Sequence, residues 1–257
     1  MTPDDAVARL ARTPRLLVAL DFDGTLAPLV DDPMTARMLP EARAAVEAIA
    51  AAPATTVALV SGRTIRDLRI IAEHGDDSPL LLAGSHGAQE WPAAASDDGA
   101  DAEERPFIET VTERAESLAA SLDGAWIEPK EFGFALHTRL VTDAARAKAL
   151  EAAVDVLVAD AAPGWRRRVG RDILEFSSRH DGKDAAVARL RERTDATAVL
   201  FAGDDVTDED ALRSLRPGDL GVRVGAGESA ASVRVADIPE LAALLVRLAH
   251  GRAPEPE

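Results

Sequence analysis

Residues 16–25 read LLVALDFDGT, in which a short apolar run leads directly into two aspartates, a glycine and a threonine. A bounded apolar run of this length is typical of a buried strand. Gly24 permits a sharp turn after that strand, so two aspartates at positions i and i+2 can both face one site. The stretch therefore predicts a strand whose carboxyl end presents Asp21, Asp23 and Thr25.

Strands, polar turns and helices follow one another in the same way elsewhere in the chain. The apolar run 56–60 ends at Ser61-Gly62-Arg63, and the run 80–83 ends at Gly84-Ser85-His86-Gly87. The further expected elements are helices at 40–52, 64–73, 183–193, 208–215 and 239–250, and strands at 198–202 and 220–224. Strands that alternate with helices indicate a parallel sheet, so we predict an α/β, Rossmann-like core.

The pattern changes between residues 93 and 180. Residues 93–106 are small and acidic, as expected of a linker or a long exposed loop. They precede expected helices at 107–122 and 142–160 and strand-like runs at 125–129, 132–138, 165–169 and 172–177. Two helices and two hairpins indicate an α+β layout with an antiparallel sheet. We therefore predict a core formed by residues 1–104 and 181–257, with a second domain inserted at 105–180.

The composition excludes several classes of protein. The chain has 45 acidic and 29 basic residues, a net charge of −16, which argues against nucleic acid or an anionic membrane as a partner. The absence of cysteine excludes disulfides, zinc-thiolate sites, iron–sulfur clusters and thiol nucleophiles. The acidic start is unlike a secretory signal, and no run approaches the ~20 apolar residues of a membrane span. We expect a soluble cytoplasmic protein and favour a monomer, although the sequence does not fix the oligomeric state.

Four polar clusters follow the expected parallel strands or begin the next helix. In open α/β sheets, ligands bind at the carboxyl ends of the strands, where elements far apart in sequence converge. The clusters are Asp21 with Asp23 and Thr25, then Ser61, then Lys183, and finally Asp204 with Asp205. Carboxylates from two strands suit Mg²⁺, which prefers carboxylates, waters and a substrate phosphate. A metal beside carboxylates, a hydroxyl and a lysine is typical of phosphoryl transfer.

Two of these aspartates are candidates for the chemistry itself. Asp21 is the candidate nucleophile, because a carboxylate can form an aspartyl-phosphate and so divide the reaction into two easier steps. Asp23 is placed to protonate the leaving alkoxide and then to take a proton from the attacking water.

Lysine usage adds an argument for two further positions. The only lysines are Lys130, Lys148 and Lys183, and arginine supplies the other basic residues. An ammonium is a compact point charge that a planar guanidinium does not replace. Lys130 stands in the segment Glu128-Pro129-Lys130 and Lys183 in the segment DGKDAA, whereas Lys148 lies on an alanine-rich helix.

Simpler structural explanations exist for several residues. Taken alone, DFDGT could be a strand-end turn, and Ser61-Gly62 could cap the helix that begins near Thr64. Glu209 and Asp210 are better explained as the solvated acidic first turn of a helix. His86 and His137 could be structural, because a histidine more often has its hydrogen bonds satisfied within the fold than it serves as a ligand.

The segments DFDGTL, Ser61, Lys183 and GDDVTDED together resemble the four ordered motifs of the haloacid dehalogenase superfamily. The resemblance implies Mg²⁺ held by the carboxylates of Asp21 and Asp204 and by the backbone carbonyl of Asp23. It also implies that Ser61 and Lys183 contact the phosphoryl oxygens. Asp205 and Asp208 would lie next to the residues that bind the metal, without binding it themselves. An insertion between the second and third motifs resembles the family's C2 cap, the domain that sets substrate specificity.

A narrower resemblance extends over nearly the whole chain. The segments DFDGTLAP, SGR, GSHGA, Glu128-Pro129-Lys130, His137-Thr138-Arg139, LEF, DGKDAA and GDDVTDEDAL resemble trehalose-6-phosphate phosphatases. That family implies hydrolysis of trehalose 6-phosphate, with Glu128, Lys130 and Glu175 gripping the sugar hydroxyls and Arg63 and Arg139 near the phosphate or sugar. Thr25 and His86 are further candidates for substrate contact. The alternatives are another C2-capped phosphatase, acting on sucrose or mannosylglycerate phosphates, and a non-catalytic sugar-phosphate sensor on the same fold.

Overall fold

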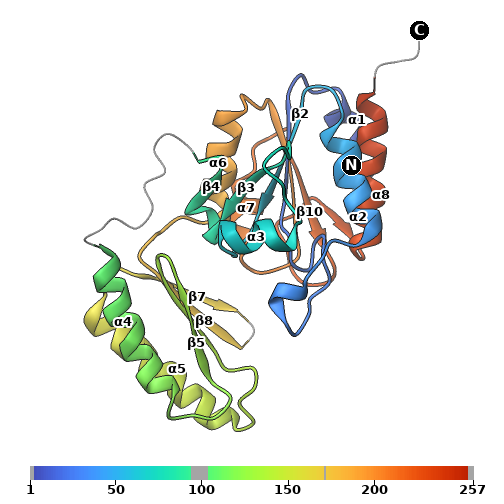
Figure 1. Ribbon diagram of the computed structural model, residues 1–257. Coiled ribbons are helices and arrows are strands. Elements are labelled where there is room, and N and C mark those ends of the chain that lie inside the picture. The colour runs from blue at the N-terminus through green and yellow to red at the C-terminus, as the bar shows by residue number, and fades with distance from the viewer. Residues whose placement is uncertain (1–2, 94–103, 171, 254–257) are drawn as a thin grey trace. The chain divides into compact units, whose positions relative to one another are not determined.

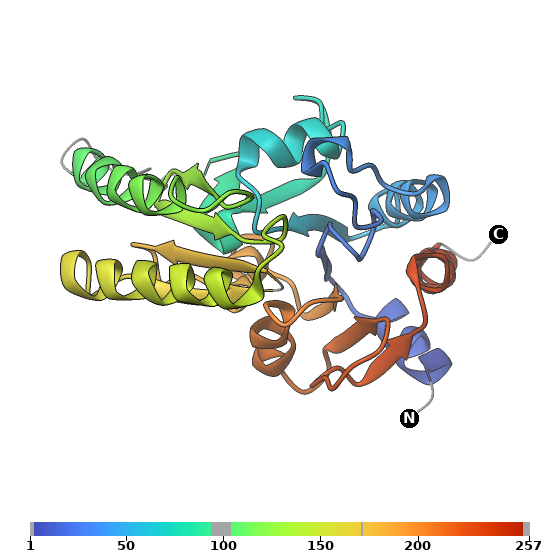
Figure 2. The ribbon, with the colours of Figure 1, turned by 90° about the horizontal axis from the view of Figure 1, so that it is seen from below.

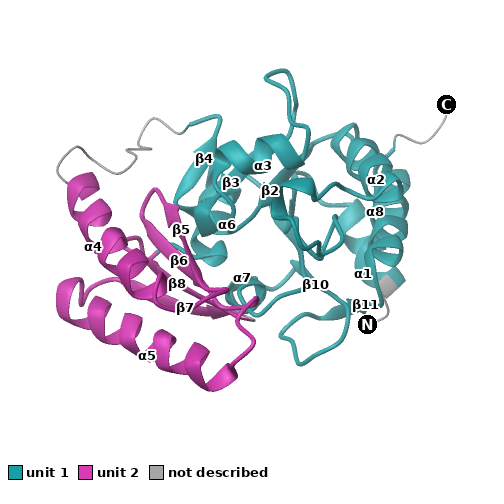
Figure 3. Cartoon of the chain, turned by 60° about the horizontal axis from the view of Figure 1, so that its bottom comes forward, with its two compact units in different colours: residues 1–95, 181–257 teal, residues 96–180 magenta. Residues whose placement is uncertain are grey.

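A seven-stranded sheet forms the centre of the first of two units into which the chain divides (Figure 3). The computed structural model describes residues 3–93, 104–170 and 172–253. The first unit comprises residues 1–95 and 181–257, and the second comprises residues 96–180. The sequence predicts the junctions between the core and the inserted domain at 104/105 and 180/181. Most of the expected linker lies outside the described residues, but its last residues, 104–106, already belong to a helix.

The strand that carries the DFDGT motif is central to this sheet. The strands, in spatial order, are β11 (Val233–Val235), β10 (Leu220–Val224), β9 (Ala198–Gly203), β1 (Leu16–Leu20), β2 (Thr55–Val60), β3 (Leu81–Gly84) and β4 (Gln89–Trp91). All neighbouring pairs are parallel except β3 and β4. Every residue of β1 is buried, because a parallel strand covered on both faces has no solvent side. The predicted parallel α/β core is confirmed.

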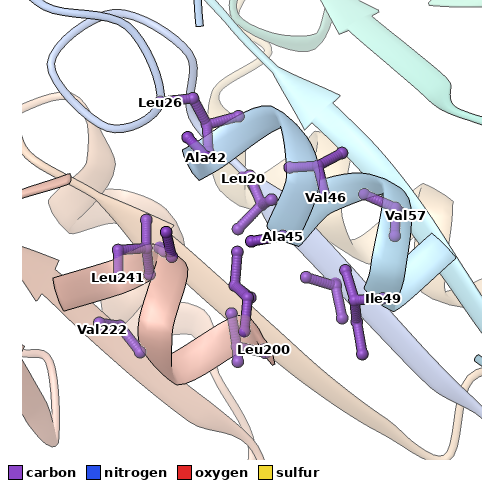
Figure 4. Close-up of a cluster of buried hydrophobic side chains, with 14 of the residues drawn as sticks. Leu20, Leu26, Ala42, Ala45, Val46, Ile49, Val57, Leu200, Val222 and Leu241 are labelled. Atoms are coloured by element: carbon purple, nitrogen blue, oxygen red, sulfur yellow. The ribbon is translucent and has the colours of Figure 1, made fainter. Parts of the chain in front are cut away.

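Helices cover both faces of the sheet (Figures 1 and 2). One face packs against α1 (Pro3–Ala11), α2 (Pro40–Ala50), α3 (Ile65–Ile71) and α8 (Ile238–Arg252), and the other against α6 (Lys183–Arg193) and α7 (Asp208–Ser214). Figure 4 shows Leu20 and Leu200 of the sheet meeting Ala45 of α2 and Leu241 of α8. This packing fixes the strand ends, from which the polar clusters project.

One α-helix and two strands among the described residues were not expected from the sequence. Helix α1 lies in a segment that we considered only as a targeting signal, yet Ala6, Val7 and Leu10 are buried in the core. Strands β4 and β11 lie at the two edges of the sheet and have three residues each. A run this short is below the length at which apolar periodicity identifies a strand.

The second unit has an antiparallel sheet of four strands. They are, in spatial order, β5 (Trp126–Lys130), β6 (Gly133–His137), β8 (Ile173–Ser177) and β7 (Arg166–Gly170), with helices α4 (Glu104–Ala119) and α5 (Ala144–Ala161). Phe134, Leu136, Leu174 and Phe176 pack with the two helices. Since side chains alternate between the faces of a strand, Glu128, Lys130, His137, Arg168 and Glu175 lie on the opposite face. We call this surface the polar face.

Arg252, near the end of α8, joins three segments of the first unit. Its guanidinium donates hydrogen bonds to carbonyl oxygens and hydroxyls at the end of α1 and the start of β2, at 2.7–3.4 Å; the partners are Leu10, Ala11, Thr13, Pro53, Ala54 and Thr55. Only 8% of this arginine is exposed. One side chain therefore connects the end of α8 to the end of α1 and to the start of β2.

We expect Arg252→Met to lower the free energy of unfolding by about 3 kcal/mol, because several partly buried carbonyls each lose a hydrogen bond. Urea unfolding followed by circular dichroism measures this. Arg247→Met on the same helix is the matched control. Arg247 is half exposed and lies 3.6 Å from Asp4, so its loss should cost less than about 0.5 kcal/mol. Equal losses for the two variants would contradict this role for Arg252.

The described helices include none that combines the length and the apolar character required to cross a membrane.

Candidate active site

The polar clusters at the ends of β1, β2 and β9 gather at one edge of the sheet, as the parallel topology requires. After β1 the chain turns back, because the Gly24 N–H bonds to the carbonyl of Ala27 at 2.7 Å. Gly24 has φ +80°, and a Cβ there would lie 2.1 Å from the carboxylate of Asp204. Glycine is therefore required for this turn to approach the loop after β9.

Lys183 lies between two buried carboxylates. Its Nζ donates to Oδ1 of Asp21 and to Oδ1 of Asp208, both at 2.6 Å. All three residues are at most 4% exposed. Burial acts to lower the pKa of Lys183, but the charges and hydrogen bonds of Asp208 and Asp21 outweigh it and raise that pKa above its ordinary value. The side chain therefore carries a full positive charge at neutral pH.

Asp208 also holds the loop that follows β9. Its Oδ2 accepts the backbone N–H groups of Asp204 at 3.0 Å and of Asp205 at 2.9 Å. A Cβ at Gly203 would lie 2.3 Å from the Asp208 carboxyl carbon. One carboxylate thus fixes both the Lys183 ammonium and the backbone beside Asp204. The side chain of Asp205 is exposed.

The carboxylates of this site crowd one another. Oxygens of Asp21, Asp204 and Asp208 lie within 4.8 Å of one another. Burial raises the pKa of Asp21 well above its ordinary value despite Lys183. Burial and the Asp208 charge raise the pKa of Asp204 to about 6. The hydroxyl of Thr25 lies 3.0 Å from Oδ2 of Asp21 and 3.3 Å from Oδ1 of Asp204. Hard oxygen donors with unbalanced negative charge are suited to a divalent cation.

Asp23 is held by an arginine from the loop after β2. The guanidinium of Arg63 donates to both carboxylate oxygens of Asp23, at 2.7 Å each. Such a forked pair fixes the orientation of the carboxylate. The family resemblance implies that Arg63 lies near the phosphate or sugar, and the structure adds this contact with Asp23.

Ser61 directly follows β2 and is 2% exposed. Its Oγ accepts the backbone N–H of Arg63 at 3.2 Å. The interpretation of Ser61 as a helix cap is wrong, because the cap of α3 is Thr64, whose hydroxyl accepts the N–H of Asp67 at 3.2 Å. The N–H of His86 bonds to the Ser61 carbonyl at 2.9 Å, which places His86 beside this turn.

Glu209 was expected to be solvated, and this expectation is wrong. The residue is 5% exposed, and Oε2 accepts the N–H of Ala230 at 2.9 Å. Its Oε1 lies 3.6 Å from Nη1 of Arg223, which donates to the carbonyl of Asp205 at 2.9 Å. Sequence reasoning missed Arg223 as a support of this loop. Its position within the otherwise apolar strand LGVRV was the available signal.

The candidate sugar residues Glu128, Lys130 and Glu175 come together on the polar face of the second unit. Nζ of Lys130 lies 3.5 Å from Oε2 of Glu175 and 3.9 Å from Oε1 of Glu128. Burial acts to raise the pKa of Glu128, but the hydrogen bond with His137 at 2.8 Å and the Lys130 charge lower that pKa overall. Glu128 is therefore ionised at neutral pH.

Two aromatic contacts extend the polar face. The His137 ring stacks on Trp126 with centroids 4.5 Å apart, and the Arg139 guanidinium lies 5.1 Å from the centre of the Trp126 ring. Trp126 was not identified from the sequence, because it lies in none of the motifs.

Residues 19–239 match the trehalose-phosphatase family. The chain is 32% identical over 237 residues to a trehalose-phosphate phosphatase of Mycobacterium marinum. The aligned region covers 86% of this chain and 58% of that protein. The chain therefore spans little more than half the length of this curated relative.

Solved structures show the same fold. The C-terminal domain of a Candida albicans trehalose-6-phosphate phosphatase has a TM-score of 0.80 at 19% identity, over 97% of this chain and 98% of that one. A subclass IIB sugar phosphatase of the haloacid dehalogenase superfamily has a TM-score of 0.60 at 16% identity, over 93% of this chain and 100% of that one. The predicted fold class, a parallel-sheet core of the haloacid dehalogenase type with a separate antiparallel sheet, is confirmed.

Proposed function

Because the chain belongs to the trehalose-phosphatase family, we propose that it hydrolyses trehalose 6-phosphate to trehalose and phosphate in a magnesium-dependent reaction. The observation that carries the proposal is the buried group formed by Asp21, Lys183 and Asp208 beside Asp204. A buried carboxylate next to a permanent ammonium is suited to act as a nucleophile on an anionic phosphoryl group.

The carboxylates of Asp21 and Asp204 and the backbone carbonyl of Asp23 would hold the ion. When bound, Mg²⁺ supplies positive charge that offsets the charges of these carboxylates and of the phosphoryl group. The donor set fits the ion, because it consists of hard oxygens.

The first half of the reaction transfers the phosphoryl group to the protein. An oxygen of Asp21 attacks phosphorus, the bond from phosphorus to the sugar 6-oxygen breaks, and Asp23 gives its proton to that oxygen. Lys183 offsets the charge of the transferred group, and the Ser61 hydroxyl donates a hydrogen bond to it. Arg63 keeps the Asp23 carboxylate in a defined orientation.

The second half releases phosphate. Asp23 takes a proton from water, the water oxygen attacks phosphorus, and the bond from phosphorus to Asp21 breaks. Asp21 is then an ionised carboxylate again, and Asp23 is protonated for the next cycle. We assign recognition of the sugar hydroxyls to Glu128, Lys130 and Glu175 of the polar face, with Arg139 beside them. From the sequence, we expect this reaction to take place in the cytoplasm.

A panel of sugar phosphates tests the proposal. We expect phosphate release from trehalose 6-phosphate to exceed that from sucrose 6-phosphate, mannosylglycerate phosphate and glucose 6-phosphate by at least about tenfold in kcat/KM. A chelator should abolish turnover, and added Mg²⁺ should restore it, because the ion offsets the charge of the transferred group.

The same panel distinguishes the alternatives. Preference for another sugar phosphate would replace the substrate while retaining the chemistry. Binding of trehalose 6-phosphate without turnover in the presence of Mg²⁺ would instead identify a sensor.

A further inference from the structure

Glu175 on the polar face is held from two sides by different cations. Its Oε2 lies 3.5 Å from Nζ of Lys130, and its Oε1 accepts a hydrogen bond from Nη1 of Arg168 at 3.1 Å. Arg168 and Glu175 stand directly opposite each other on β7 and β8. Both side chains are 11% exposed, so solvent screens this pair less than a surface ion pair.

Glu128 is held in a comparable way. One of its oxygens lies 3.9 Å from Lys130 and the other is hydrogen-bonded to His137. Lys130 therefore lies between two carboxylates, each of which has a second partner on its other oxygen. Arg168 is the partner for Glu175 that neither the motifs nor the resemblance identified.

Arg168 supplies a second cation to the carboxylates of the polar face. Arg168 and Lys130 are the two cations that contact the Glu175 carboxylate, and Lys130 also lies 3.9 Å from Glu128. Carboxylates held in fixed orientations by such cations present acceptors that suit the hydroxyl groups of a sugar. Without Arg168, Lys130 alone would have to neutralise both carboxylates.

We propose that Arg168 is a positioning residue that orients the Glu175 carboxylate toward the hydroxyls of the sugar and so determines affinity for the sugar part of the substrate. This inference rests on the proposed function. It deepens that function by separating sugar recognition at Arg168 from phosphoryl transfer at Asp21.

The neighbouring arginine of β7 provides a matched control. Arg167 points to the opposite face of the sheet, where its guanidinium forms a forked pair with Asp155 of α5 at 2.6 and 2.9 Å. Arg167→Met removes the same charge from the same strand without touching Glu175. Any effect of net charge or of the edge strand itself should appear in both variants.

The test compares steady-state kinetics on two substrates, trehalose 6-phosphate and para-nitrophenyl phosphate, which has no sugar. For Arg168→Met we expect the KM for trehalose 6-phosphate to rise roughly tenfold, as for the loss of one charge-assisted hydrogen bond. Its kcat and its turnover of para-nitrophenyl phosphate should stay within about twofold of the wild type. Arg168→Lys should restore part of the affinity, and Arg167→Met should match the wild type.

Two results would overturn the proposal. One is an unchanged KM in Arg168→Met, and the other is an equal loss of activity on both substrates, which indicates a purely structural role. The wild type is assayed first, so that failure of the proposed function is seen separately. If it prefers another sugar phosphate, Arg168 is judged on that substrate. If it hydrolyses no sugar phosphate, both proposals fall.

Discussion

Replacing Asp21 by asparagine is expected to lower kcat by about 10⁴-fold or more, because the amide cannot form the aspartyl-phosphate that carries the reaction. The change is nearly isosteric. Asp21 is buried and its pKa is already raised, so a neutral side chain is tolerated there, and Lys183 keeps its contact with Asp208. The variant should therefore fold like the wild type while losing its chemistry.

Two measurements check this prediction. Phosphate release is followed at saturating trehalose 6-phosphate with Mg²⁺, and acid-quenched protein is examined for covalently bound phosphate after a reaction with labelled substrate. The wild type should carry the label, and Asp21→Asn should not. Asp195→Asn is the control, since Asp195 is exposed and belongs to none of the motifs. Turnover at the wild-type rate in Asp21→Asn would rule out a nucleophilic role for this residue.

Replacing Lys183 by methionine is expected to impair both stability and activity. The substitution leaves the carboxylates of Asp21 and Asp208 buried without their shared cation, which should cost about 3 kcal/mol in the free energy of unfolding. Loss of the ammonium beside the transferred group should also lower kcat by at least about a hundredfold. Lys148→Met, on an exposed position of α5, is the matched control for both measurements.

The stability loss in Lys183→Met should grow with pH. A carboxyl whose pKa is higher in the folded than in the unfolded state contributes stability at low pH, and this contribution is lost as pH rises through the folded pKa. The pKa values of Asp21 and Asp204 are raised even with Lys183 present, the latter to about 6, and both should rise further without it.

Urea unfolding at pH 5.5 and pH 8, in the presence of a chelator, should therefore show the larger deficit at pH 8. A deficit that is the same at both pH values would argue that packing, rather than charge, is what Lys183 supplies.

The candidate site of the first unit was largely predictable from the sequence because of where its residues stand. Asp21, Ser61 and Asp204 each follow a short apolar run, and in a parallel sheet that position places them at one edge. Lys183 begins a helix whose bounds were predicted correctly. The motifs therefore specify the gathering of these side chains without any knowledge of the packing.

The supporting residues could not be found in that way. Arg252 and Arg168 are ordinary arginines in the sequence, and although Arg223 stands out within an apolar strand, the partner that each arginine holds is set by tertiary packing. Glu209 was misjudged for the same reason, because acidic residues in the first turn of a helix are usually solvated. Only the structure shows that Ala230 and Arg223 cover it.

The position of β1 in the sheet affects how the chain folds. Its neighbours are β2, which follows it closely, and β9, which is synthesised only after the whole second unit. Until β9 emerges, β1 has an unpaired edge with apolar side chains on both faces, and such an edge is prone to association with other chains. The second unit is continuous in sequence and has its own hydrophobic core. Closure of the core sheet over this long separation is entropically costly and slow, and the same late step brings Asp204 and Asp208 to Asp21.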